Sequence, residues 1–227
     1  MKKLITSAFF LCITMLISPY AFAIPVEYIN VSPRETVNIT YGAQNVNVYA
    51  GIYNILIDDI SYDSFCIDVW QRVPNTESNY SITSPINAPD YFENGMGEAK
   101  SKAIRELWYG NYASATTDSS IAAGLQLAIW EVVVEDGDPY NGQIFSFSNG
   151  NFQSNNDYGA LGMLNNLDNS GFASLSGLTH DAYQDYAYAS PVPEPTTMLL
   201  FGIGLIGLVG IGRRTFFKKA VAEPLHF

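Results

Sequence analysis

Two side chains in this 227-residue sequence have the chemistry to form a covalent bond with each other. They are the thiol of Cys66, within FCIDVW at residues 65–70, and the side-chain amide of Gln126. A thiolate is a nucleophile that can attack the glutamine carbonyl carbon and release ammonia, which leaves an internal thioester. The acyl carbon of that thioester would then react with an amine. We therefore predict Cys66 and Gln126 as a thioester pair.

Cys66 has no cysteine partner within the exported part of the chain. The other cysteine, Cys12, lies in an N-terminal segment that reads as a signal peptide. A leftover cysteine in a secreted protein indicates either intermolecular pairing or a reactive thiol. The two histidines, His180 and His226, are too few for a zinc site and poorly placed for a Cys-His catalytic pair. We expect no metal, no cofactor and no enzymatic turnover.

Gln126 is predicted to point into the protein. It lies four residues after Ala122, three before Ile129 and four before Trp130, so it shares their helical face. An amide buried without hydrogen-bond partners costs about 1–3 kcal/mol. Two interpretations stay open: Gln126 is the chemical partner of Cys66, or it is a core glutamine bonded to backbone groups.

The rest of the exported domain is predicted to be an α+β fold, a β-rich sandwich or barrel-like domain with a small helical subdomain. Residues 24–70 are rich in Val, Ile, Tyr and Phe, which favours strands. In residues 65–70 the odd positions are expected on one face and the even positions on the other. The further predicted elements are a short strand at 80–82, helices at 96–108, 119–135 and 160–167, and a strand at 185–189. Gly110 and Asn111 are expected to end the first helix, and Asp118 and Gly137 to cap the second.

The N-terminus has the features of a secretory signal peptide. Lysines near the start are followed by an apolar run at 4–17 and by the small-x-small pattern AFA at 21–23. Cleavage between Ala23 and Ile24 would remove residues 1–23.

The C-terminus carries three ordered elements of a second targeting signal. They are Pro193-Glu194-Pro195, the apolar stretch 196–212, and the pair Arg213-Arg214. The apolar stretch is near the lower length limit for a transmembrane helix, and the arginines favour a cytoplasmic position for its end. Residues 191–214 resemble the PEP-CTERM sorting signal of Gram-negative bacteria. That resemblance implies processing by an exosortase and delivery to the cell surface or extracellular matrix. Residues 215–227 would form a cytoplasmic tail.

The domain at 24–190 also resembles a family. FCID at 65–68 followed by LQLAIW at 125–130 resembles the thioester domains of bacterial surface adhesins, and LWYGNY at 107–112 is similar to an element between their motifs. The resemblance implies that Cys66 supplies the sulfur and Gln126 the acyl group. It implies covalent attachment to amines on a partner surface.

Composition limits the other partners. The formal net charge is −11, and six of the 11 Lys and Arg residues lie in the two terminal segments. Such an acidic exported part repels nucleic acid. The acidic turn at 135–142 could hold calcium, although a solvated turn explains it as well. The alternative to covalent attachment is a structural module that binds extracellular polysaccharide or matrix without a thioester.

Overall fold

The strands of this protein pair into one antiparallel sheet, most of which closes into a ring. The computed structural model describes residues 23–89 and 91–189. The strands are β1 (Ala23–Tyr41), β2 (Gln44–Ile57), β3 (Ile60–Cys66), β4 (Ser78–Thr83), β5 (Phe152–Ser154), β6 (Leu175–Thr179) and β7 (Tyr186–Ala189). The helices are η1 (Pro85–Asn87), α2 (Gly97–Ala115), α3 (Ser119–Val134) and α4 (Ala160–Asn165).

The sheet has the order β2-β3-β7-β6-β4-β1-β5, and β1 also pairs with β2. Six of its strands therefore form a closed ring of hydrogen-bonded neighbours. The long strand β1 makes this closure possible because its start pairs with β4, through Ile24 and Tyr80, while its end pairs with β5. The β1–β2 register shifts twice along its length. Such irregularities bend a strand and increase its twist, so that different parts of one strand can pair with different neighbouring strands.

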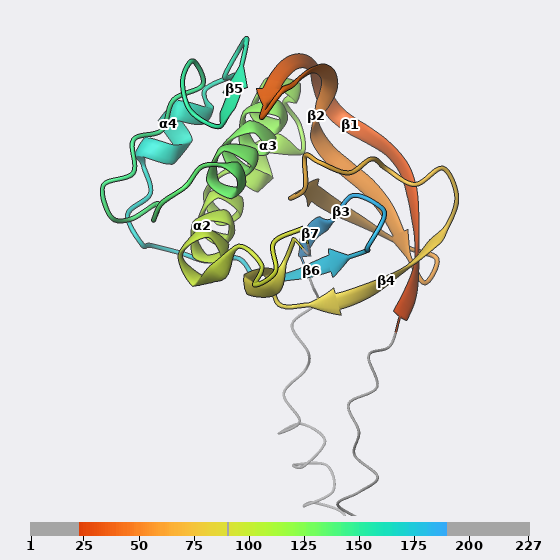
Figure 1. Ribbon diagram of the computed structural model, residues 1–227. Coiled ribbons are helices and arrows are strands. Elements are labelled where there is room, and N and C mark those ends of the chain that lie inside the picture. Colours follow the sequence, from red (N-terminus) through yellow and green to blue (C-terminus); the bar gives the residue numbers. More distant parts are fainter. Residues whose placement is uncertain (1–22, 90, 190–227) are drawn as a thin grey trace, which may run out of the picture. The chain divides into compact units, whose positions relative to one another are not determined.

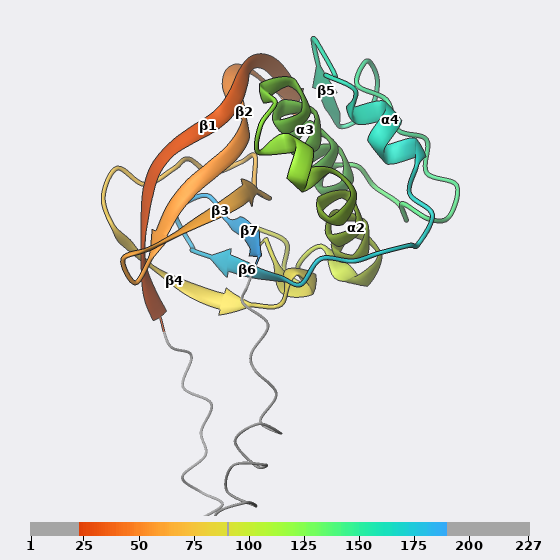
Figure 2. The same cartoon turned by 180° about the vertical axis from the view of Figure 1, so that it is seen from behind.

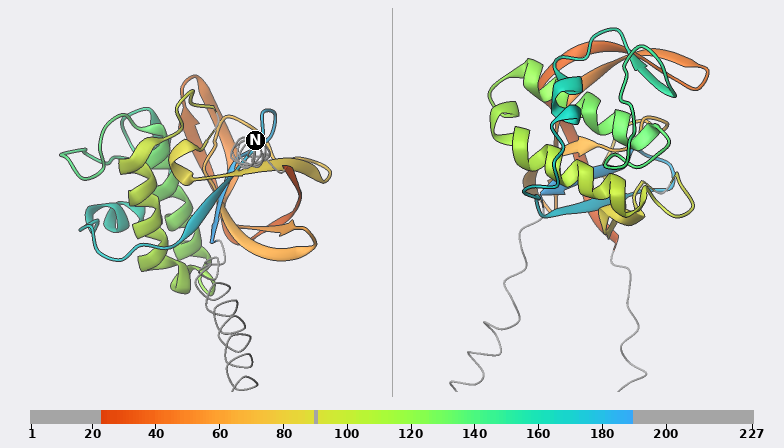
Figure 3. Two further views of the ribbon diagram at one scale, coloured as in Figure 1. Left: turned by 90° about the horizontal axis from the view of Figure 1, so that it is seen from below. Right: turned by 90° about the vertical axis from the view of Figure 1, so that its left-hand side faces the viewer.

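Helices α2 and α3 pack together against one side of the strands (Figures 1 and 3). Helix α3 contacts β1, β2 and β3 and also α2 and α4. Its residues from Ala122 to Val133 are all buried. Apart from Gln126 and Glu131, these residues are apolar or glycine, so that every side of the helix can be buried. Gly124 is needed because a methyl group there would overlap the carbonyl oxygen of Tyr158.

The α+β class and most of the predicted elements are confirmed. Asp118 caps α3, because its carboxylate accepts hydrogen bonds from the backbone N–H groups of Ser120 and Ile121. The end predicted for the first helix is wrong, since α2 continues through Gly110 to Ala115. Glycine in a helix costs about 1 kcal/mol. Packing of the last turns, including the fully buried Ala115, offsets that cost.

One prediction about the strands is wrong, and not every strand was predicted. The alternation of faces predicted for residues 65–70 does not separate inside from outside, because residues 64–69 are all buried. Strand β3 ends at Cys66, and α3 contacts it. Strand β6 was not predicted, because its sequence LSGLT lacks an aromatic or β-branched run. It forms because β4 and β7 supply partners on both sides.

The described residues all belong to one of the two units into which the chain divides, Met1–Ser190 and Pro191–Phe227. Within residues 23–89 and 91–189, no helix is long and apolar enough to cross a membrane. Residues 1–22 of the signal peptide predicted at 1–23, the membrane helix at 196–212, the sorting motif and the tail at 215–227 lie outside the described residues, whereas Ala23 begins β1.

Candidate functional site

Cys66 lies at the end of β3, fully buried, with several polar groups around its sulfur. The indole Nε1–H of Trp130 donates to Sγ at 3.2 Å, and the backbone N–H of Asp68 donates at 3.3 Å. The thiol donates to the carbonyl oxygen of Asp68 at 3.0 Å. The side-chain Nε2 of Gln184 also contacts Sγ. Three residues, Asp68, Trp130 and Gln184, therefore make polar contacts with the sulfur.

Gln126 reaches the same residue but contacts its backbone. Its Oε1 accepts a hydrogen bond from the Cys66 N–H at 2.9 Å, and its Nε2 donates to the Cys66 carbonyl oxygen at 2.8 Å. The pairing of β3 with β2 stops at Ser64, so the Cys66 backbone needs another partner on that side. The Gln126 amide takes the place of that strand. The prediction that Gln126 points inward is confirmed, and the backbone supplies its partners.

Gln184 is the glutamine whose side chain meets the sulfur. The residue pairs Cys66 with Tyr186 and Phe65 with Ala187 fix the register between β3 and β7. Side chains two residues apart on a strand share a face, so Gln184 lies on the same side as Tyr186 and Cys66. The Gln184 backbone is fixed as well, because its N–H donates to Arg72 O at 3.1 Å and its carbonyl accepts from the Tyr80 hydroxyl at 3.1 Å.

Burial controls the protonation state of Cys66. Desolvation raises the pKa of the Cys66 thiol far above its ordinary value, and the negative charge of Asp68 raises it further. Hydrogen bonds from Trp130, from the Asp68 backbone and from Gln184 oppose this effect without overcoming it. The thiol is therefore neutral at physiological pH, and a stable thiolate is not the resting form.

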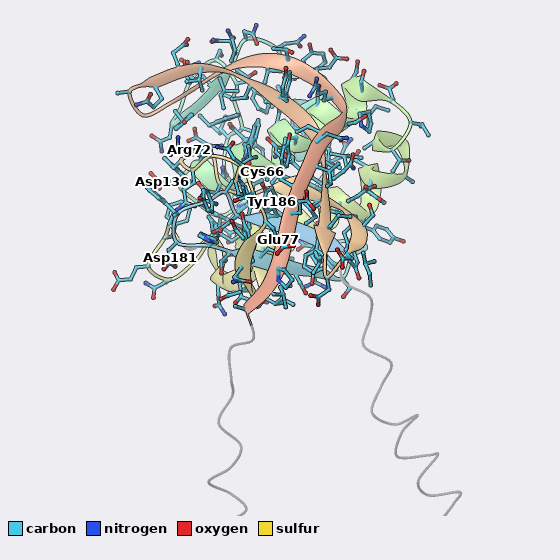
Figure 4. All side chains as sticks on the ribbon, turned by 90° about the vertical axis from the view of Figure 1, so that its right-hand side faces the viewer. Cys66, Arg72, Glu77, Asp136, Asp181 and Tyr186 are labelled. Carbon is cyan, nitrogen blue, oxygen red and sulfur yellow. The ribbon has the colours of Figure 1, made fainter. Side chains whose placement is uncertain are left out.

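Aromatic side chains shield this site from water. Phe65 and Trp108 pack edge to face at 5.0 Å, and Tyr53 and Tyr186 pack at 5.7 Å. Burial raises the pKa of the Tyr186 hydroxyl strongly, because its phenolate would be desolvated. Cys66 and Tyr186 are buried, and Figure 4 shows Arg72, Asp136 and Asp181 toward one edge of the molecule.

Other residues considered in the sequence have structural roles. Glu135 accepts a hydrogen bond from the Phe152 N–H at 2.7 Å, and Asp138 accepts one from the Tyr140 N–H at 2.9 Å. No cluster of metal-ligating side chains occurs among the described residues. His180 accepts a hydrogen bond from the Ala182 N–H through Nδ1 and packs against Tyr80.

Gln184 was not predicted from the sequence to be part of the site. The sequence contained a hint of this, because Gln184 directly precedes a predicted strand. In an extended segment its side chain would lie on the same face as those of Tyr186 and Tyr188. What could not be read from the sequence is the pairing of that strand with β3. The pairing joins segments about 120 residues apart, and no local pattern specifies it.

Comparison with known proteins identifies the C-terminal signal. The PEP-CTERM protein-sorting motif matches residues 191–214. The protein is therefore exported, carries a PEP-CTERM signal that an exosortase processes, and is sorted to the membrane or cell surface. No curated protein and no solved structure matches the chain. The resemblance to thioester domains gains no support from these comparisons.

Proposed function

We propose that this exported protein forms an internal thioester at Cys66 and uses it to attach covalently to an amine on a partner surface. The contact between the Cys66 sulfur and the Gln184 side-chain amide carries this proposal. Cys66 is fully buried and Gln184 nearly so, which protects an activated acyl group from hydrolysis. Residues 24–190 contain no second cysteine, so Cys66 has no internal disulfide that would compete with the proposed thioester.

Two glutamines approach Cys66, and their contacts favour different roles. Both ends of the Gln126 amide are bonded to the Cys66 backbone, which suits a group that positions the cysteine. The Gln184 Nε2 contacts the sulfur and also donates to the Asp68 carbonyl oxygen at 3.3 Å, and its approach to the sulfur favours Gln184 as the acyl donor. We favour the Cys66–Gln184 pair, while the Cys66–Gln126 pair expected from the sequence stays a prediction that experiment can decide.

The bond-forming step balances without another reactant. The Cys66 sulfur attacks the side-chain carbonyl carbon of Gln184, the C–N bond breaks, and the thiol proton leaves with the amide nitrogen as ammonia. The high pKa of the thiol implies that proton transfer accompanies attack, because a preformed thiolate is scarce. Trp130 donates a hydrogen bond to the same sulfur at 3.2 Å.

In the capture step a nitrogen atom is the nucleophile and the Cys66 sulfur is the leaving group. An amine on the partner attacks the acyl carbon, the C–S bond breaks, and the amine proton restores the Cys66 thiol. The product is an amide between the glutamine position and the partner. Because the thioester is consumed once per molecule, we infer that the protein is an adhesin and not an enzyme. Its site of action would be the surface or extracellular matrix of a Gram-negative cell.

Labelling with methylamine tests this proposal and identifies the acyl donor. The full chain, purified in detergent after export, is treated with isotopically labelled methylamine and then digested for peptide mass mapping. We expect one methylamine per chain at position 184, and no incorporation in Cys66→Ala. A label at position 126 would assign the acyl group to Gln126 instead.

The untreated protein supplies a second readout. The peptides that carry Cys66 and Gln184 should remain linked and lack one ammonia relative to their sequences. Separate, unmodified peptides together with no methylamine incorporation would overturn the covalent function. The non-covalent polysaccharide- or matrix-binding module would then remain. The matched control is Gln153→Ala, an amide on β5 away from the contacts of Cys66, which should label like the wild type.

A further inference from the structure

A cavity of about 520 Å³ lies between α2, α4 and the segment that follows α4. This volume is within the range of about 300–1,000 Å³ typical of small-molecule sites. Helix α4 lies on the side of α2 and α3 that faces away from β3, β4, β6 and β7 (Figures 1 and 2). None of the residues that contact the Cys66 sulfur lines this cavity. It is therefore a feature separate from the thiol site.

The wall of the cavity is fixed by a buried carboxylate. Glu106 Oε1 accepts hydrogen bonds from the backbone N–H groups of Asp168 at 2.8 Å and Ser170 at 3.3 Å. Its Oε2 accepts one from the Tyr140 hydroxyl at 2.5 Å. The first two bonds hold the segment after α4 against α2, and the third holds Tyr140 against the same helix. The cavity is thus formed in advance, which reduces the entropy lost when a ligand binds.

An aromatic ring stands at the rim in a fixed position. Tyr109 is 66% exposed, which is high for an aromatic side chain. One edge of its ring lies against the backbone of Gly171, where an added methyl group would overlap the ring. The ring therefore has a defined place although most of it faces solvent. An exposed and rigid tyrosine ring can pack against the C–H face of a ligand while the tyrosine hydroxyl stays hydrated.

The polar groups around this ring suit a ligand with many hydroxyls and no charge. Asn111, Asn166 and Asp168 line the cavity together with the ring. The Asn111 amide is oriented by a hydrogen bond from its Nδ2 to Leu107 O at 2.8 Å. Among the described residues, no Lys, Arg or His lines the cavity, so an anionic ligand finds no countercharge there. Glu106 is already saturated by three donors, which leaves Asp168 as the only carboxylate available to a cation.

We infer that this cavity binds an uncharged pyranose unit of a polysaccharide, with Tyr109 stacking on the sugar ring and the Asn and Asp side chains bonding its hydroxyls. Planar amides and carboxylates match pairs of adjacent hydroxyl groups, which are both donors and acceptors. The inference does not depend on the thioester. A protein with both sites would hold a matrix glycan at one place and an amine at another.

Calorimetric titration of the full chain in detergent tests the inference with four defined probes. Two are neutral, cellotetraose and the tetramer of N-acetylglucosamine; one is cationic, the tetramer of glucosamine; one is anionic, the tetramer of galacturonic acid. We expect a neutral probe to bind and the anionic probe not to bind. Tyr109→Ala should weaken binding by about tenfold or more, and Tyr109→Phe should retain it.

The controls separate this site from the rest of the surface. Tyr91→Ala changes a comparably exposed tyrosine and should bind like the wild type. Cys66→Ala should also bind normally, which distinguishes failure here from failure of the thioester proposal. Failure of both neutral probes, binding of the cationic probe alone, or unchanged affinity in Tyr109→Ala would each overturn the inference. Tyr109 is exposed enough that its variants should keep the wild-type unfolding temperature.

Discussion

The side-chain amide of Gln184 contacts the sulfur of Cys66 because β7 pairs with β3 in one specific register. Tyr186 lies opposite Cys66, so a residue two positions before Tyr186 shares the face on which the thiol lies. A shift of one residue would turn Gln184 to the other face of the sheet. The neighbouring bond from Ile67 N–H to Asp185 O, at 3.0 Å, extends the same register beyond the strand. The thiol and the amide are thus brought together by strand pairing.

The proposed thioester predicts that Cys66 does not titrate as a thiol until an amine releases it. The experiment uses the chain with Cys12→Ala, so that Cys66 is the single cysteine. After unfolding in guanidinium, a thiol reagent should detect almost no thiol in untreated protein and one per chain after methylamine treatment. One thiol per chain before treatment would contradict the proposal.

Removing the Gln126 amide should destabilise the fold. Gln126→Ala leaves the Cys66 N–H and C=O buried with no replacement, because β2 no longer pairs with β3 at that point. We expect a loss of about 2–4 kcal/mol in the free energy of unfolding, from two unsatisfied backbone groups and the space left behind. Urea unfolding measures it. Gln153→Ala, whose amide bond is at the surface, should lose less than about 0.5 kcal/mol. Equal losses in the two variants would remove the positioning role.

The sequence was a good guide wherever a local pattern decided the structure. The cap at Asp118 and the inward direction of Gln126 both follow from spacing along one helix. The end predicted at Gly110 was wrong because tertiary packing overrode a local helix breaker. The pattern carries no information about how well the last turns of α2 are buried.

The candidate site was only partly predictable, because some of its residues are recognised by their chemistry and others only by the partners that the fold gives them. Cys66 was identified because it is chemically unusual in an exported chain, and chemistry can be read from residue type. Gln184 is an ordinary residue in the segment YQDY, and its importance comes from the partner that the fold gives it. The cavity beside Tyr109 was likewise invisible, because it is formed by α2 and a segment about 60 residues later.

The stability of the protein should fall as the pH rises toward neutrality because of Glu131. This side chain is fully buried on α3, where its Oε1 accepts a hydrogen bond from the Ser146 N–H at 2.9 Å. Burial raises the pKa of Glu131 from 4.5 to about 7. The folded state therefore holds the proton more tightly than the unfolded state. This stabilisation is fully present below about pH 4.5 and is lost as the pH rises through about 7.

Glu131→Gln removes this titration and isolates its effect. Between pH 5 and pH 8, the free energy of unfolding of the variant should rise relative to the wild type by about 1–3 kcal/mol. Urea unfolding at several pH values measures the difference. The control Glu27→Gln changes an exposed carboxyl group and should follow the wild type at every pH. A constant difference between Glu131→Gln and the wild type would contradict the prediction.

Trp130 should accelerate the capture of an amine by stabilising the departing sulfur. Its Nε1–H donates to the Cys66 Sγ at 3.2 Å, and that sulfur gains negative charge when the C–S bond breaks. A hydrogen bond to a charged acceptor contributes about 1.5–3 kcal/mol, so its loss should slow aminolysis by about 10- to 100-fold. Trp130→Phe keeps an aromatic ring and removes the donor. The rate of methylamine incorporation, followed by mass spectrometry, measures the effect.

Trp108→Phe is the matched control, because Trp108 is equally buried and packs against Phe65 without a hydrogen bond to the sulfur. If both variants react at the wild-type rate, the indole N–H has no part in the departure of the sulfur. If both slow equally, the loss reflects packing around the site and not the hydrogen bond.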